Sequence, residues 1–324
     1  MLKKLFINAR YFIAPLLILA TLFGVLAGGP WVWTGVFLLG VGIIIDTLHT
    51  KQTMGAGFDD EGDTNANPTL MNVTMYLMLP VFIALQCVLA YQIYNGMAGV
   101  ELLGAVLSSG IFAGIGIIYG HELAHTKGFS FIIARWMMAL SGSSHFCYAH
   151  VYNHHLELGV PFLTWQNRWI RGYAMSLPTI ALFWFAGAWL GIACMALLWL
   201  ISNFELEALN YLEHYGLIRE TGSPIDYRHS WDNSTMFTSW FFIEIGRQAD
   251  HHDRGETHFW ELDEVGAPNC GNGYFTLFAL ALIPPLFHKY MERQLAKWDE
   301  NEASEGELKI AEEMNAIAGY SQNI

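Results

Sequence analysis

The sequence is poor in charged residues, and basic residues are the scarcer kind. Only 14% of its 324 residues are charged, whereas about a quarter are charged in a typical soluble domain. Lys and Arg number 16 against 29 acidic residues, which gives a net charge of −13. Nucleic-acid binding needs clustered Lys and Arg. The composition therefore excludes a nucleic-acid partner, and the hydrophobic fraction of 53% with 15% aromatic residues is typical of a membrane protein.

Cysteines are few and widely separated. No two of them have CxxC spacing, which excludes a zinc ribbon and a fused rubredoxin-type iron site. Three of the four lie in or beside apolar segments, which indicates core packing and not a disulfide framework. The cysteines are Cys87, Cys147, Cys194 and Cys270. The sequence also has no internal repeat, and we expect a single membrane domain over residues 1–324.

Long apolar runs dominate what is present. A helix needs about 20 mostly apolar residues to cross the hydrocarbon core of a bilayer. A later run, residues 274–287, is too short to cross and contains Pro284 and Pro285, so we expect it at the membrane interface. We predict an all-α polytopic membrane protein with about six transmembrane helices and a cytoplasmic, histidine-rich cap. The predicted spans are residues 11–28, 31–50, 70–94, 98–120, 175–190 and 191–212, the last two separated by a break near residues 187–191.

The distribution of basic residues predicts the orientation. Lys3, Lys4 and Arg10 place the N-terminus in the cytoplasm by the positive-inside rule. Six spans then bring residues 51–68, residues 121–171 and everything after about residue 213 to the cytoplasmic side. An odd number of spans would place parts of these segments on opposite sides of the membrane.

Eight histidines form four groups, and three of these groups lie within a few residues of a long apolar run or in the loop that follows one. Residues i and i+4 share a face of a helix, and neutral imidazole binds Zn, Fe, Cu or Ni. One ion takes about four to six ligands, so eight histidines indicate two ions. Two ions beside an apolar membrane region favour oxygen chemistry on a lipophilic substrate, and hence iron. The groups are His121 with His125, His150 with His154 and His155, His214 alone, and His251 with His252.

Simpler interpretations remain open for single motifs. HExxH recurs by chance, and His121 with His125 could be two interfacial histidines at a helix end. Glu213 could reach water, or it could support a ligating histidine through a hydrogen bond. The other candidates for supporting contacts are Glu205, Glu207, Asp250 and Asp253. We expect His145, His229 and His258 near the site or on the surface, and His49 and His288 at the membrane interface.

Four sequence motifs carry a family resemblance. HELAHTKG, AHVYNHH, NYLEHYG and DHH occur in this order, and together with the spans they resemble the integral-membrane di-iron hydroxylases. This group includes the alkane 1-monooxygenases and the xylene monooxygenase hydroxylase, and it is related to membrane fatty-acid desaturases. The resemblance extends from about residue 31 to about residue 285. It implies that all eight grouped histidines bind two non-haem irons, and that one oxygen atom of O2 enters a terminal methyl C–H bond of an n-alkane or alkyl-aromatic substrate, giving a primary alcohol.

The resemblance also implies partners and one departure. A rubredoxin or ferredoxin-type donor with its NAD(P)H reductase would supply electrons, and the protein would lie in the bacterial inner membrane with its site facing the cytoplasm. The family usually has a ninth histidine three residues before the final pair, where this chain has Gln248. One iron could therefore have an amide or water ligand.

Three other functions stay open. A desaturase or fatty-acyl hydroxylase could use the same scaffold. A membrane zinc protease could use HExxH with Glu122 as general base, although six grouped histidines would then be unexplained. A metal carrier or inactive scaffold is the non-enzymatic alternative, and the glutamine at position 248 keeps it open.

Overall fold

The computed structural model describes residues 2–53, 66–147 and 168–318. In these ranges regular structure is helical apart from two isolated β-bridges, which confirms the predicted all-α class. The α-helices are α1 (Leu2–Ala9), α2 (Ile13–Ala27), α3 (Thr34–Leu48), α4 (Pro68–Tyr94), α5 (Gly99–Ala124), α6 (Phe129–Leu140), α8 (Arg168–Ala174), α9 (Leu177–His214), α10 (Met236–Phe241), α11 (Gln248–Asp253), α12 (Tyr274–Ala281), α13 (Pro284–Asn301) and α14 (Glu305–Ile317). Short 3-10 helices are η1 (Arg10–Phe12), η2 (Gly29–Trp33), η3 (Tyr227–His229) and η4 (Phe259–Glu261).

The chain divides into two compact units. Unit 1 comprises Met1–Gly42, Ala56–Glu207 and Trp240–Ile243. Unit 2 comprises Ile43–Gly55, Ala208–Ser239 and Glu244–Ile324. Unit 1 contains most of the apolar helices, and unit 2 contains the segments after the last apolar run. The prediction of one membrane domain with a cytoplasmic cap stays a prediction.

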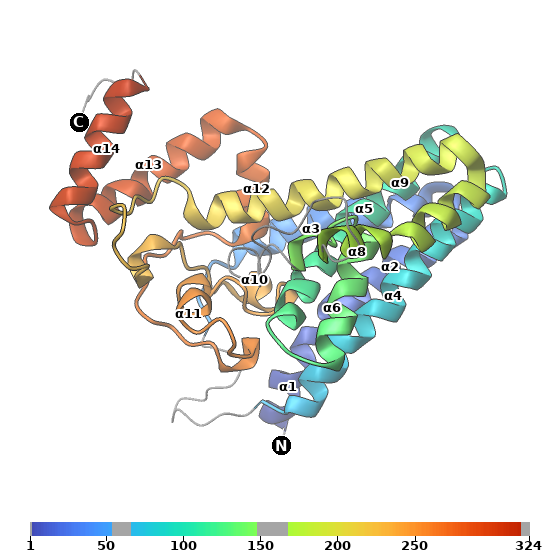
Figure 1. Ribbon diagram of the computed structural model, residues 1–324, viewed down its shortest axis with the longest axis horizontal. Coiled ribbons are helices and arrows are strands. Elements are labelled where there is room, and N and C mark those ends of the chain that lie inside the picture. Colours follow the sequence, from blue (N-terminus) through green and yellow to red (C-terminus); the bar gives the residue numbers. More distant parts are fainter. Residues whose placement is uncertain (1, 54–65, 148–167, 319–324) are drawn as a thin grey trace. The chain divides into compact units, whose positions relative to one another are not determined.

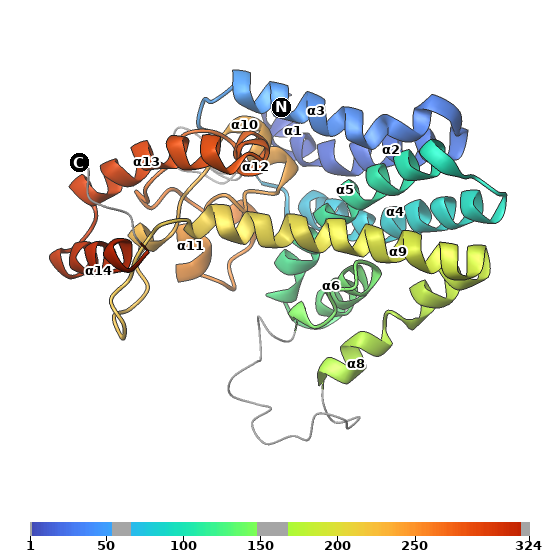
Figure 2. The same ribbon diagram turned by 90° about the horizontal axis from the view of Figure 1, so that it is seen from above.

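Helix α5 lies at the centre of unit 1. It contacts α2, α4 and α6, as Figure 1 and Figure 2 show. Its most apolar stretch is 83% buried, against 44% for α4. Glycines permit this close packing: a Cβ on Gly110 would lie 2.9 Å from Ile201, and one on Gly116 would lie 2.8 Å from Phe82. The end of α5, where the first histidine pair is located, is therefore held by a well-packed helix.

Five helices of the described chain are long and apolar enough to cross a membrane. The first four agree with the predicted spans to within a few residues, which supports an integral membrane protein. The fifth, Ile170–His214, covers both remaining predicted spans. The five candidates are Phe6–Ala27, Gly29–Leu48, Pro68–Tyr94, Gly99–Ala124 and Ile170–His214.

A break divides the fifth candidate. Gly187 and Ala188 have non-helical backbone angles, and the chain folds back there (Figure 1) so that Gly191 lies against the carbonyl of Phe183. The predicted break near residues 187–191 is thus confirmed. The helical part before it, residues 177–186, is about 15 Å long, about half of the hydrocarbon thickness. The count of six spans, and the orientation derived from it, stays a prediction.

The start of α4 has a clear local cause. Asn67 caps α4, because its side-chain oxygen accepts the N–H groups of Thr69 (3.0 Å) and Leu70 (3.2 Å), and Pro68 begins the helix where its missing N–H costs nothing.

The run 274–287 does not form one helix, since α12 ends at Ala281 and α13 begins at Pro284. This agrees with the expectation that the run does not cross the membrane as one helix.

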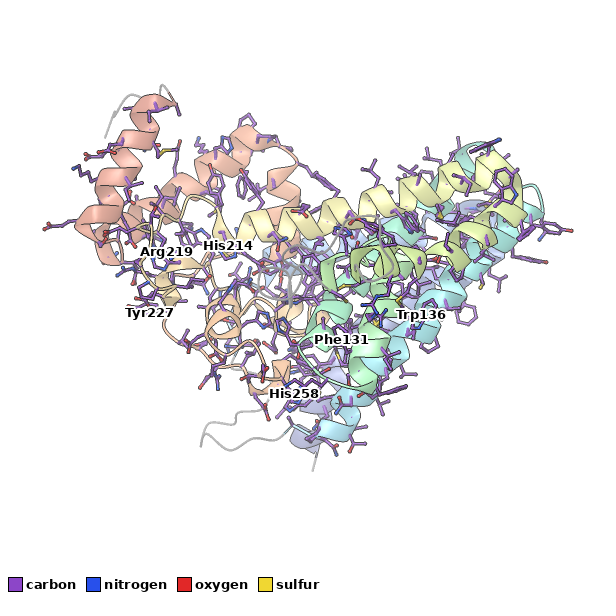
Figure 3. The ribbon with its side chains drawn as sticks, viewed as in Figure 1. Phe131, Trp136, His214, Arg219, Tyr227 and His258 are labelled. Atoms are coloured by element: carbon purple, nitrogen blue, oxygen red, sulfur yellow. The ribbon has the colours of Figure 1, made fainter. Side chains whose placement is uncertain are left out.

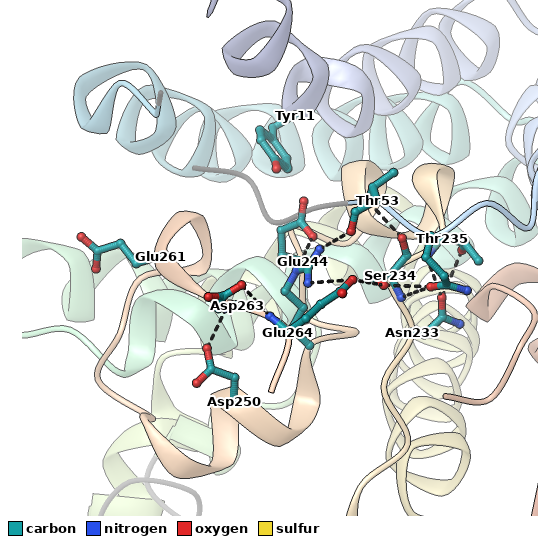
Figure 4. A network of polar contacts seen from close by, with 12 residues as sticks. Tyr11, Thr53, Asn233, Ser234, Thr235, Glu244, Asp250, Glu261, Asp263 and Glu264 are labelled. Atoms are coloured by element: carbon teal, nitrogen blue, oxygen red, sulfur yellow. Dashed lines mark hydrogen bonds and ion pairs between the residues drawn. The ribbon is translucent and has the colours of Figure 1, made fainter. Parts of the chain in front are cut away.

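Buried polar groups organise unit 2. Asp46 accepts hydrogen bonds from the hydroxyls of Thr235 and Thr238, both 3.1 Å, and from the N–H of Thr276, 3.2 Å. The guanidinium of Arg247 binds the Glu244 carboxylate at 3.1 Å. Figure 4 shows the network that continues through neighbouring polar groups. These contacts fix the segment between α9 and α11. In the sequence, the one local sign of them is Asp46, an acidic residue within an apolar run.

Asp232 makes unit 2 sensitive to pH. Burial raises the pKa of its carboxyl from 3.8 to about 7, although the N–H of Ala249 and the charge of Arg247 act in the opposite direction. The protonated form is thus favoured by folding, so its contribution to stability is complete below about pH 4 and is lost as the pH rises through 7. We expect the apparent Tm of the metal-free protein to fall as the pH rises from about 4 to about 7, and to level off above the folded pKa. In Asp232→Asn, where the amide oxygen can still accept the Ala249 N–H, this fall should be smaller, and an equal fall would contradict the assignment.

Candidate metal centre

The first histidine pair has the geometry that its spacing predicted. His121 lies in the last turn of α5 and is 8% exposed, and His125 caps the helix with α-helical backbone angles. Their Nε2 atoms are 3.2 Å apart. Two imidazole nitrogens at about 2.1 Å from one ion, with an angle of about 90–110° between them, would lie about 3.0–3.4 Å apart. The pair therefore fits two ligands of one metal ion.

His214 is the last residue of α9 (Figure 3), and its ring orientation is fixed from outside the helix. Its Nδ1 lies 3.2 Å from the backbone oxygen of His229. A carbonyl oxygen only accepts, so Nδ1 must carry the proton and Nε2 keeps a lone pair. This is the tautomer that a metal ligand with a supporting hydrogen bond needs.

The residues after His214 hold this helix end in place. Gly216 has φ of +73°, which favours glycine, and a Cβ there would lie 2.7 Å from Leu295 of α13. The ring of Tyr215 stacks on His288 at a centroid distance of 5.9 Å. The structure therefore explains the glycine in the sequence His214-Tyr215-Gly216. Its backbone conformation and its lack of a side chain allow α13 to pack against the end of α9.

The last group lies on the short helix α11. His251 is 5% exposed and His252 is exposed. The ring centroids of His252 and His214 are 5.2 Å apart, and those of His251 and His252 are 6.2 Å apart. Unit 2 thus brings together His214, His251 and His252.

Gln248 occupies the expected position on the same helix. Its Nε2 lies 3.0 Å from Nε2 of His252, and it is 6% exposed. Its Oε1 is buried, and no described residue donates a hydrogen bond to it. Rotation of the Gln248 amide by 180° would place Oε1, in place of Nε2, next to His252. The amide oxygen of Gln248 could therefore bind either a metal ion or a ring nitrogen of His252 that carries a proton.

The other residues that the sequence singled out differ in whether the structure describes them and in what they contact. His150, His154 and His155 lie outside the described residues. Glu213 is 2% exposed and accepts a hydrogen bond from the hydroxyl of Tyr274 at 3.3 Å, so the alternative that it reaches water is wrong. Asp250 binds Arg254 and the N–H of Asp263, and so stabilises the loop after α11.

The remaining glutamates and histidines also differ in role. Glu205 lies against Gly114 of α5, and Glu207 is exposed. His229, expected near the site or on the surface, is 8% exposed, and its backbone supports His214. His145 stacks on Tyr173, and His258 stacks on Trp260.

Comparison with known proteins finds one family model and several monooxygenases that resemble this chain. Residues 157–280 match the family model described as fatty acid desaturase. The xylene/toluene monooxygenase hydroxylase component of Pseudomonas putida is 26% identical, over 96% of this chain and 95% of its own. Alkane 1-monooxygenase 1 of Pseudomonas aeruginosa is 27% identical, over 79% of this chain and 80% of its own. Alkane 1-monooxygenase 2 of Alcanivorax borkumensis is 26% identical, over 89% of each chain.

These relatives are all oxidoreductases of the monooxygenase type, and each covers most of the chain at modest identity. The predictions of an enzyme and of the family resemblance are therefore confirmed. Over most of its length, this chain is similar to alkane and xylene monooxygenases.

Proposed function

We propose that this protein hydroxylates a terminal methyl C–H bond of a hydrophobic substrate, an n-alkane or alkyl-arene, with O2 at a non-haem di-iron centre. The observation that carries the proposal is the combination of full-length similarity to hydroxylases with two histidine groups whose geometry fits metal binding. When bound, iron supplies the reaction with O2 that oxidises the C–H bond. The eight predicted ligands are those of the four histidine groups.

The protein's own residues prepare the ligands. The carbonyl of His229 holds the proton of His214 on Nδ1, which directs the Nε2 lone pair outward. The α-helical spacing of His121 and His125 places both imidazoles on one side of α5. His121 and His251 are both buried, which limits the access of water to their rings. An alkane offers no polar group for recognition, so its binding must come from apolar surface, which the helices of unit 1 provide.

Electron supply and location complete the proposal. The sequence has no CxxC pair that could hold a rubredoxin-type iron, so the two electrons come from a separate rubredoxin or ferredoxin-type donor with its NAD(P)H reductase. We place the protein in the bacterial inner membrane with the site facing the cytoplasm, on the basis of Lys3, Lys4 and Arg10.

A desaturase or fatty-acyl hydroxylase is the second candidate, because residues 157–280 match the fatty acid desaturase family model. The two reactions share the ligand type and differ in product. The zinc protease has no support beyond HExxH, and the full-length relatives make it weaker than the hydroxylase.

Metal content and product should be measured on the same preparation. The protein is purified in detergent, iron and zinc are counted per chain, and O2, an electron-donor system and a mixture of octane, dodecane and xylene are supplied. We expect close to two irons and a primary alcohol, and the consumed component identifies the substrate class. One zinc per chain would favour the protease. Two irons without oxidised hydrocarbon, but with product from a fatty-acyl substrate, would favour the second candidate.

Gln248→His tests the departure from the family pattern. The imidazole would offer the ligand that relatives have, so we expect tighter iron retention against a chelator, by about tenfold, with turnover equal to or above that of the natural chain. Gln248→Leu, which removes both amide atoms, is the matched control and should retain less iron. Loss of activity in Gln248→His with normal iron content would instead mean that the amide is adapted to this site.

A further inference from the structure

The C-terminal helix α14 contains one acidic residue whose environment is unlike that of its neighbours. Glu307 is 1% exposed, whereas Glu305, Glu312 and Glu313 on the same helix are exposed. It belongs to a capping box: the hydroxyl of Ser304 accepts its N–H at 3.1 Å, and its Oε2 accepts the Ser304 N–H at 2.8 Å. Capping does not require burial, and burying a carboxylate is costly unless it has partners. The second oxygen should therefore have a role of its own.

That second oxygen binds the segment that follows α9. Oε1 of Glu307 lies 2.8 Å from Nε2 of His229 and 3.3 Å from Nη2 of Arg228. Although burial raises the pKa of Glu307, the Ser304 N–H, His229 and Arg228 together hold it below its ordinary value. Glu307 is thus an anion at neutral pH.

The contacts of His229 determine its tautomer. The N–H of Asp226 donates to Nδ1 of His229 at 2.9 Å, so Nδ1 carries the lone pair. Nε2 must then carry the proton, which it donates to Glu307. Both ring nitrogens are fully used, and the ring cannot rotate without breaking one of these bonds. The backbone of His229 is therefore held at a defined position.

That backbone position is the one that supports His214. The carbonyl of His229 accepts the Nδ1 proton of His214 at 3.2 Å. Two further bonds hold the same segment: Nε1 of Trp298 donates to the carbonyl of Arg228, and the N–H of Trp231 donates to the carbonyl of Glu213, both at 2.8 Å. A continuous series of contacts thus leads from α14 through His229 to the candidate metal ligand.

We propose that Glu307 is a positioning residue for His214, acting through His229, so that the C-terminal helix is part of the support of the metal centre. The inference rests on the proposed function, because it takes His214 as a ligand. Partners in the outer shell of a metal site fix the tautomer and orientation of the ligand, and their loss typically lowers affinity about 10- to 100-fold. Glu307 is one residue further away, so the lower end of that range applies.

The test uses the full chain, stripped of metal in detergent and titrated anaerobically with Co²⁺ against a competing chelator. Glu307→Ala should weaken cobalt binding about tenfold and change the visible absorption of bound cobalt. In Glu307→Gln the amide oxygen still accepts the His229 proton, so affinity should largely be restored. Ser304→Ala removes the cap and leaves the His229 contact, so it should lower the Tm without changing cobalt affinity. If Glu307→Ala does not fold, Glu307→Asp, which keeps the charge but is too short to make both contacts, should weaken binding instead.

The outcomes separate this inference from the proposed function. If Glu307→Ala or Glu307→Asp lowers the Tm but binds cobalt as the natural chain does, the contact only fastens the tail and the inference is wrong. His214→Ala is the reference variant. If it binds cobalt normally, the assignment of His214 as a ligand fails and the inference fails with it. If it loses a cobalt ion whereas the Glu307 variants do not, only the inference fails.

Discussion

Replacing His121 with alanine is expected to lower hydroxylation at least about a hundredfold, because loss of an outer-shell partner alone costs about 10- to 100-fold and His121 would be a direct ligand. In this variant the ion would lose one of the two imidazole nitrogens, 3.2 Å apart in the natural chain, that the end of α5 supplies. Iron per chain should fall together with turnover. Both are measured on the same preparation, by elemental analysis and by alcohol formed per chain.

The control for this variant is a histidine that directly follows another apolar helix. His49 follows α3, is exposed, and its Nδ1 lies 3.2 Å from the carbonyl of Ile45. His49→Ala should keep both iron and activity. If His121→Ala keeps its iron and turns over normally while remaining folded, the pair at the end of α5 is not a metal site, and the proposal loses both of these ligands.

Replacing Arg247 with alanine is expected to destabilise the fold by about 3–5 kcal/mol, because the buried carboxylate of Glu244 loses its contact with the guanidinium group. Arg247 and Glu244 are fully buried, their contact is 3.1 Å, and Nη2 of Arg247 also donates to the carbonyl of Thr53 at 2.6 Å. The apparent Tm in detergent and the rate of limited proteolysis in unit 2 measure the effect.

Two comparisons make the Arg247 result specific. Arg219 is exposed and donates only to the carbonyl of Ser223 among its described hydrogen bonds, so Arg219→Ala should change the Tm little. The double variant Glu244→Met with Arg247→Met removes both charges and should be more stable than Arg247→Ala alone. A double variant that is less stable than Arg247→Ala would show that the pair contributes by more than mutual neutralisation.

The sequence predicted the contacts that local geometry determines. His121 and His125 are four residues apart, and a continuing helix brings them together whatever surrounds it. The break near residues 187–191 was also predictable, because glycine interrupts an apolar run that is too long for one span. The number of membrane spans was harder to predict from the sequence, because composition does not show how long the helical parts on each side of a break are.

What the sequence by itself determined is the helical membrane class, the grouping of histidines and the family resemblance, because these depend on periodicity and on residues close together in the chain. The tertiary structure decided which groups support them. The carboxylate of Asp46 meets Thr235, 189 residues later, and Glu307 meets His229 across 78 residues. A buried polar group needs a partner, but only packing selects which one, and for His214 that choice determines which ring nitrogen carries the proton.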